Sequence, residues 1–166
     1  MTLLLAAVGA TVTALLELTI GLYLQVGNAE PHLVLVVGIV VTLTLDLEAG
    51  LVWAFVGGLV LDVLAQRPLG SSAFALLLCL GAAALLGHWF IRLRQIVPIP
   101  AAFVLGVLYS MTLFFAFNAL AAPIPVADPL ARVIPSAVYD LVVATLIGPL
   151  AISIHDRHAD VDRIDW

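Results

Sequence analysis

The chain has 166 residues, of which 64% are hydrophobic and only 10% are charged, and its mean hydropathy is +1.22. A soluble domain carries about a quarter charged residues and exposes many of them, so this composition excludes a surface that mostly faces water. The formal net charge of −5 argues against nucleic acid, because a phosphate backbone requires basic partners. The composition predicts an integral membrane protein.

Apolar blocks separated by short polar turns make up most of the chain, and a transmembrane helix needs about 20 mostly apolar residues. We predict an all-α bundle of about six transmembrane helices, at residues 3–24, 32–45, 48–65, 72–91, 99–120 and 135–154. The second and third blocks are short and would also suit a re-entrant pair, although their flanking turns extend both toward spanning length. One compact bundle is expected over residues 1–155, followed by a short acidic tail at 156–166 that is solvated and partly disordered.

Arginine decides the predicted orientation, because the chain contains no lysine. The first block is expected to be a retained helix and not a cleaved signal peptide, because no basic residue precedes it. Six spans then place both termini on one side of the membrane. The proline-containing loop at 121–134 then lies outside the cell. The positive-inside rule favours cytoplasmic termini, since four arginines fall on the side of the termini (Arg92, Arg94, Arg157 and Arg163) and two fall opposite (Arg67 and Arg132).

Small residues spaced by four mark helix faces that approach closely in lipid. Three such faces occur: Ala6, Ala10 and Ala14 in the first block; Gly50, Ala54 and Gly58 in the third; Cys79, Ala83 and Gly87 in the fourth. Gly70 is grouped with these helix-packing residues. We expect mostly packing within the bundle, with the alternative that one face serves a partner. Cys79, the single cysteine, is expected to be a small packing residue.

Four polar residues inside the apolar blocks form a predicted outer polar layer: Glu17, Asp62, Asn118 and Asp140. An ionisable group in hydrocarbon costs several kcal/mol unless it is paired or hydrated. Glu17 and Asp140 are expected either to bond between helices or to serve a partner or substrate. A proton relay is less favoured, because a relay needs polar groups at several depths.

For Asp62 the expected role is structural. It either caps the turn into the next block at Ser71 and Ser72 or pairs with Arg67, since the helix dipole opposes a carboxylate at a helix C-terminus. On this reading Asp62→Asn should be tolerated better than a large residue at Gly58.

Catalytic constellations are scarce, and no catalytic, metal or cofactor residues are predicted. His155 and His158 are three residues apart, but two histidines in an acidic tail do not make a metal site. Ser71 and Ser72 have no neighbouring histidine in sequence, and no glycine-rich phosphate loop or metalloprotease histidine pair occurs. An enzyme is therefore not expected.

Three stretches carry a specific resemblance to a known family. They are Ala54-x-x-x-Gly58-Leu59-x-x-Asp62, then Leu69-Gly70-x-x-Ala73, and near the end Val138-Tyr139-Asp140 with Pro149. The chain resembles the rod shape-determining protein MreD family. In that family an asparagine often stands at the position of Asp140 and a glutamine at that of Glu17, so these two acids are departures whose role stays open.

The resemblance implies a six-helix bundle similar to the S component of an energy-coupling factor transporter, without catalytic activity. It implies a scaffold in the bacterial cytoplasmic membrane that belongs to the cell-elongation machinery. Such a protein binds the bitopic protein MreC and acts with the glycosyltransferase RodA and its transpeptidase partner in peptidoglycan synthesis and cell shape.

The alternative is a substrate-binding S component of a vitamin transporter. Ala6-x-x-x-Ala10-x-x-x-Ala14 resembles the alanine motif by which such subunits dock their transmembrane coupling partner. A vitamin pocket requires convergent polar and aromatic groups near the outer face, and the predicted outer loops contain few aromatics. A proton-coupled transporter is a third reading, which lacks a relay in the inner half and an internal duplication.

Overall fold

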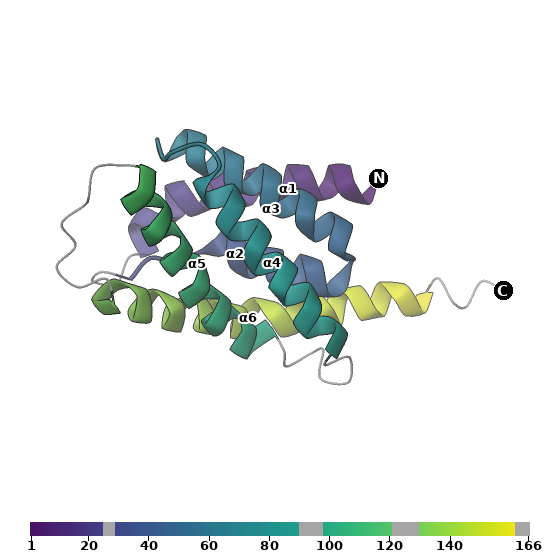
Figure 1. Ribbon diagram of the computed structural model, residues 1–166. Coiled ribbons are helices and arrows are strands. Elements are labelled where there is room, and N and C mark those ends of the chain that lie inside the picture. Colours follow the sequence, from purple (N-terminus) through teal and green to yellow (C-terminus); the bar gives the residue numbers. More distant parts are fainter. Residues whose placement is uncertain (25–28, 90–97, 121–129, 162–166) are drawn as a thin grey trace.

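A computed structural model describes residues 1–24, 29–89, 98–120 and 130–161, and within these ranges the chain forms six α-helices (Figure 1). They are α1 (Thr2–Leu24), α2 (Leu33–Thr44), α3 (Leu47–Leu64), α4 (Ser71–Trp89), α5 (Pro98–Leu120) and α6 (Leu130–Val161). The first five agree with the predicted segments to within two residues at each end. The all-helical class is therefore confirmed.

The sixth helix differs from its prediction at both ends. It begins at Leu130 rather than 135 and continues to Val161, so Pro135 and Pro149 both lie inside it. Proline favours a first turn, which is why Pro135 indicated a start, but prolines inside membrane helices are tolerated because neighbouring groups satisfy the freed carbonyls. The helix also covers part of the predicted loop at 121–134 and of the predicted tail at 156–166. The remaining residues of these two segments, 121–129 and 162–166, lie outside the described part.

Four helices have the length and composition to cross a membrane, within the described ranges: α1, α3, α4 and α5. The apolar parts of the other two are shorter, namely Leu33–Thr44 in α2 and Val133–Pro149 in α6. At 1.5 Å per residue α2 is about 18 Å long, against a hydrocarbon core of about 30 Å. The six predicted spans are thus six helices, of which four reach full spanning length.

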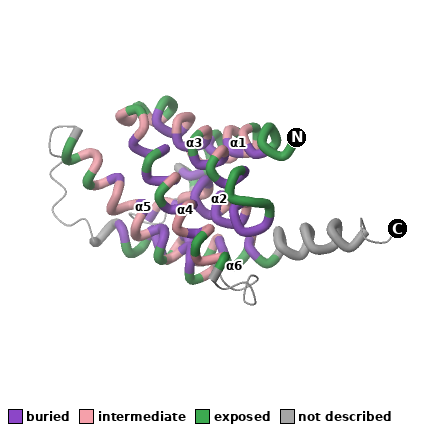
Figure 2. Tube along the Cα trace, turned by 45° about the vertical axis from the view of Figure 1, so that its right-hand side comes forward, coloured by how far each residue is buried: buried purple, intermediate pink, exposed green. Residues whose placement is uncertain are grey.

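The shortest helix, α2, occupies the centre of the bundle. It contacts all five other helices, and nine of its twelve residues are buried. The other helices surround it in the order α1, α3, α4, α5, α6, each packed against the next. Figure 2 shows the buried residues gathered toward this centre. The chain therefore places its most apolar short segment where all five other helices contact it.

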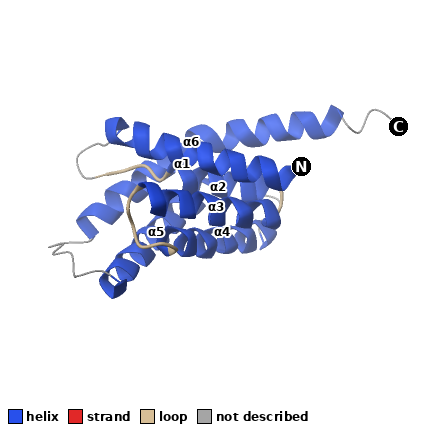
Figure 3. Ribbon diagram, turned by 90° about the horizontal axis from the view of Figure 1, so that it is seen from above, coloured by secondary structure: helices blue, strands red, loops and turns tan. Residues whose placement is uncertain are grey.

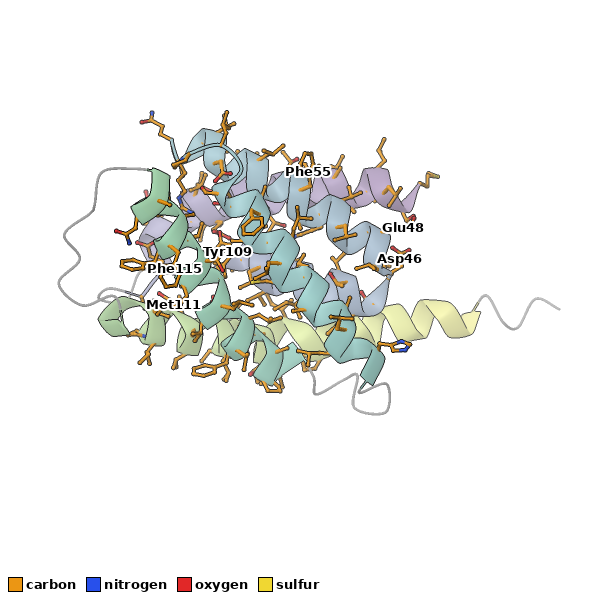
Figure 4. The ribbon with its side chains drawn as sticks, in the orientation of Figure 1. Asp46, Glu48, Phe55, Tyr109, Met111 and Phe115 are labelled. Carbon is orange, nitrogen blue, oxygen red and sulfur yellow. The ribbon has the colours of Figure 1, made fainter. Side chains whose placement is uncertain are left out.

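Both described chain ends lie at the same end of the bundle (Figure 1). The turn between α2 and α3 lies there too, as Asp46 and Glu48 show in Figure 4. Asp46 begins α3 by accepting a hydrogen bond from the backbone N–H of Ala49 at 2.6 Å. The arrangement is that of an up-and-down bundle whose termini share one side.

The predicted small-residue faces pack inside the bundle. Ala10 and Ala14 of α1 are fully buried, and a Cβ added to Gly57 of α3 would lie 3.4 Å from the Cβ of Ala10. A Cβ at Gly50 would overlap Thr42 of α2, and one at Gly58 would overlap the backbone of Ala73 in α4. Helix α3 therefore approaches α1, α2 and α4 through positions where a larger side chain has no room.

We expect Gly58→Ala to lower both the melting temperature and the amount of protein in the membrane. The added methyl group meets the backbone of Ala73, which cannot rotate away as a side chain can, and overpacking costs about 1–3 kcal/mol. Gly81→Ala on α4 is the matched control, because a Cβ there has no heavy atom within 4 Å. Equal melting temperatures for the two variants in detergent would contradict the close approach of α3 and α4.

Candidate functional site

Asp62, near the end of α3, holds the beginning of α4. Its side chain is fully buried. Oδ2 accepts the backbone N–H of Gly70 at 2.8 Å, Oδ1 accepts the hydroxyl of Ser71 at 3.1 Å, and the N–H of Ser72 approaches both oxygens at 3.0 and 3.2 Å. A negative charge at a helix N-terminus is favoured by the dipole and satisfies N–H groups that lack partners within the helix. Asp62 is thus a capping residue supplied by the preceding helix.

The turn between α3 and α4 shapes this cap. Gly70 has φ +93°, a backbone conformation that favours glycine. A Cβ at Gly70 would meet no heavy atom within 4 Å, so its grouping with the helix-packing residues was wrong. Its role is to turn the chain so that its N–H points at Asp62. Arg67 contacts this turn through a long 3.5 Å hydrogen bond from Nη1 to the Ser72 hydroxyl.

The beginning of α2 is held by acids from two other helices. His32, the residue before the first turn, makes no side-chain cap of its own. Oδ1 of Asp140, on α6, accepts the backbone N–H of His32 at 2.8 Å, and Oδ2 lies 2.8 Å from the imidazole Nδ1. Oε2 of Glu17, on α1, accepts the N–H of Val34 at 2.7 Å. Two carboxylates therefore replace the local cap that the sequence of α2 lacks.

Further polar contacts fix the same region. The indole of Trp53 donates to the carbonyl of Val34 at 3.0 Å, and the hydroxyl of Ser136 accepts the N–H of Glu30 at 3.2 Å. Together with the hydrogen bond from Val34 to Glu17, these bonds connect α1, α3 and α6 to the start of α2 and the residues before it. Backbone groups at membrane depth are tolerated only when protein satisfies them in this way.

Helix α5 contributes an aromatic ring and a glycine. The ring of Tyr109 meets the imidazole of His32 edge to face, with 5.0 Å between centroids, and Figure 4 shows Tyr109 in the middle of the bundle. A Cβ at Gly106 would come within 2.7 Å of Oδ2 of Asp140, so this glycine leaves space for the buried carboxylate. The sequence analysis missed Tyr109, Gly106 and the role of His32. A lone histidine at the start of an apolar block was the available signal for His32, since a buried acid elsewhere needs a donor.

Of the four residues predicted as a polar layer, the structure brings Glu17 and Asp140 together at one helix end and uses Asp62 at another. Asn118 is different: its side chain is exposed, and Nδ2 donates to the carbonyl of Phe114 in its own helix at 3.0 Å. Within the described residues no hydrogen bond joins Asn118 to the acids. Glu17, Asp62 and Asp140 are therefore placed to hold helix ends by charge-assisted hydrogen bonds.

The fold and this site define a multi-pass, all-helical membrane protein whose buried acids hold helix ends in place. A comparison with known protein families matches residues 1–154 to the family described as rod shape-determining protein MreD. The match covers most of the chain, so the chain belongs to the MreD family, as the resemblance in its sequence indicated. Searches of curated proteins and of solved structures give no match. Family membership assigns the chain a role in rod-shape determination at the bacterial inner membrane.

We expect Asp62→Asn to destabilise the protein, which reverses the expectation from sequence alone. Both oxygens of Asp62 accept N–H or O–H donors, and an amide nitrogen in place of one oxygen leaves a buried donor unsatisfied at a cost of about 1–3 kcal/mol. Thermal unfolding in detergent measures the loss. Asp46→Asn is the matched control, because exposed Asp46 caps a single N–H and asparagine caps as well as aspartate. Similar melting temperatures for the two variants would refute the capping role.

Proposed function

We propose that the chain is a non-catalytic membrane scaffold of the bacterial cell-elongation, or rod, complex. It binds a bitopic MreC-like protein and works beside RodA and its transpeptidase partner, thereby supporting peptidoglycan synthesis and cell shape. The observation that carries this proposal is the match of residues 1–154 to the MreD family.

The chemistry of the buried acids supports a scaffold. Asp62 and Asp140 are fully buried, and each accepts a backbone N–H at the beginning of a helix. A carboxylate used in this way stabilises a defined arrangement of helices. A general acid or base would instead need a side chain that reaches a substrate proton.

The proposed orientation places both termini in the cytoplasm. The two described chain ends share one end of the bundle in Figure 1, and the turn that contains Arg67 follows α3 at the other end. Arg157, near the end of α6, then lies on the cytoplasmic side, whereas Arg92, Arg94 and Arg163 lie outside the described residues.

The vitamin-transporter reading loses its main support in the packing of α1. The alanine row that resembles a docking motif is turned inward, with Ala6, Ala10 and Ala14 at most 4% exposed and Ala10 next to Gly57 of α3. A face already covered by the same chain is not available to a coupling subunit. We therefore keep the shape-complex scaffold as the proposed function.

We expect depletion of the protein in a rod-shaped bacterial host to give rounded cells with misplaced wall synthesis. The physical reason is that wall insertion along the cell length depends on the membrane complex that the scaffold organises. Microscopy with a fluorescent wall label measures both effects, and re-expression of the wild-type chain should restore rods. Rods of normal shape after complete depletion would contradict the proposed function.

A further inference from the structure

The imidazole of His32 faces a buried carboxylate at the beginning of α2. Oδ2 of Asp140 lies 2.8 Å from the imidazole Nδ1, and Oδ1 accepts the backbone N–H of the same histidine at 2.8 Å. The side chain of Asp140 has no exposed surface, whereas 17% of the His32 side chain remains exposed. A buried carboxylate without a cation beside it is strongly destabilising, so Asp140 favours a positive charge at this position.

The groups around His32 also favour a charged imidazole. Among the described residues, the charged or titratable groups that face it come from four parts of the fold: Glu17 on α1, Arg67 in the turn after α3, Tyr109 on α5 and Asp140 on α6. Glu30 lies two residues earlier on the same segment. The acids in this group outnumber the arginine. Burial of the ring opposes a positive charge, but contact with Asp140 and the charge of Glu17 together favour it.

Helix α5 leaves room for this contact. A Cβ added to Gly106 would come within 2.7 Å of Oδ2 of Asp140, which is the oxygen that faces the imidazole. The ring of Tyr109 packs edge to face against the imidazole, with 5.0 Å between centroids, and so restricts its orientation. A glycine and an aromatic ring, both on α5, therefore hold the carboxylate and the imidazole in register.

We propose that His32 is a proton-binding site, and that the bound proton joins α2 to α6 through an ion pair between the His32 imidazolium and Asp140. Helix α6 lies at one edge of the bundle and packs mainly against α5 and α2 (Figure 3). The charge of one histidine then sets how firmly α6 is held on the central helix. This inference does not depend on the proposed function, because it concerns only the charge at one helix end.

The proposal gives a definite direction of pH dependence. An ordinary histidine loses its proton near about pH 6.5, and the native surroundings of His32 favour the form that keeps it. The ion pair therefore contributes fully below about pH 6.5, and its contribution is lost as the pH rises through the range where native His32 is deprotonated. Deprotonation leaves Asp140 as a buried charge without a cation in contact, which weakens the junction of α2 and α6.

Nitrogen-15 NMR of histidine-labelled protein in detergent tests the proton directly, because ring nitrogens of imidazolium and neutral imidazole have different chemical shifts. At about pH 7.5 an ordinary histidine is mostly neutral, and we expect His32 to give the imidazolium signal. The signal is assigned by its absence in His32→Gln. A neutral imidazole at His32 in the wild-type protein at this pH would overturn the proposal.

Asp140→Asn removes the charge while keeping both contacts to His32. The amide oxygen accepts the backbone N–H, and the amide NH₂ donates to Nδ1 once the imidazole is neutral. We therefore expect this variant to give the neutral signal of His32 at about pH 7.5. An imidazolium signal in folded Asp140→Asn would show that Asp140 does not hold the proton, against the proposal. If the variant does not fold, the wild-type spectrum still decides.

Thermal unfolding in detergent supplies a second readout. Between about pH 6 and about pH 9, we expect the melting temperature of the wild-type protein to fall by about 3 °C more than that of His32→Gln. His88→Gln is the matched control, because His88 is exposed in the last turn of α4, and it should keep the wild-type pH dependence. Equal pH dependence in wild type and His32→Gln would contradict a proton bound at His32.

Discussion

The first turn of α2 imposes the constraint on which the rest of the bundle depends. Its N–H groups lie among apolar helices, where an unsatisfied donor costs several kcal/mol. The local sequence offers no serine, threonine or aspartate to cap them, since His32 stands at the capping position without a side-chain bond to the helix. Glu17 and Asp140 supply the missing acceptors from α1 and α6, so one short helix fixes two distant parts of the chain.

A buried acid also caps the beginning of α4, but this acid comes from the preceding helix. Asp62 reaches forward from α3 across a turn that depends on the positive φ of Gly70. Helix α3 must then lie close to α4, and the absence of a side chain at Gly58 allows this, because its Cα faces the backbone of Ala73. Capping and close packing are therefore linked: the acid can reach the helix end only if the two backbones touch.

Membership of the MreD family agrees with a molecule whose polar groups serve its own architecture. Asp62 and Asp140 each accept two or more hydrogen bonds, and Glu17 accepts the backbone N–H of Val34. Each of the three acids therefore stabilises the beginning of a helix of this same chain.

Composition and periodicity determined the membrane class, the six helices and most of their ends, because about 20 apolar residues between polar turns permit few alternatives. The residues also indicated that Asp62 acts near Ser71 and Ser72, since these groups are close in sequence. Sequence could not show that α2 is the central helix, that Asp140 meets His32, or that Gly70 serves a turn instead of a packing face. Those features depend on contacts between residues as far as 108 positions apart, and on a backbone angle. Local propensity carries no record of such contacts, so only the tertiary structure decided which acids meet which helix ends.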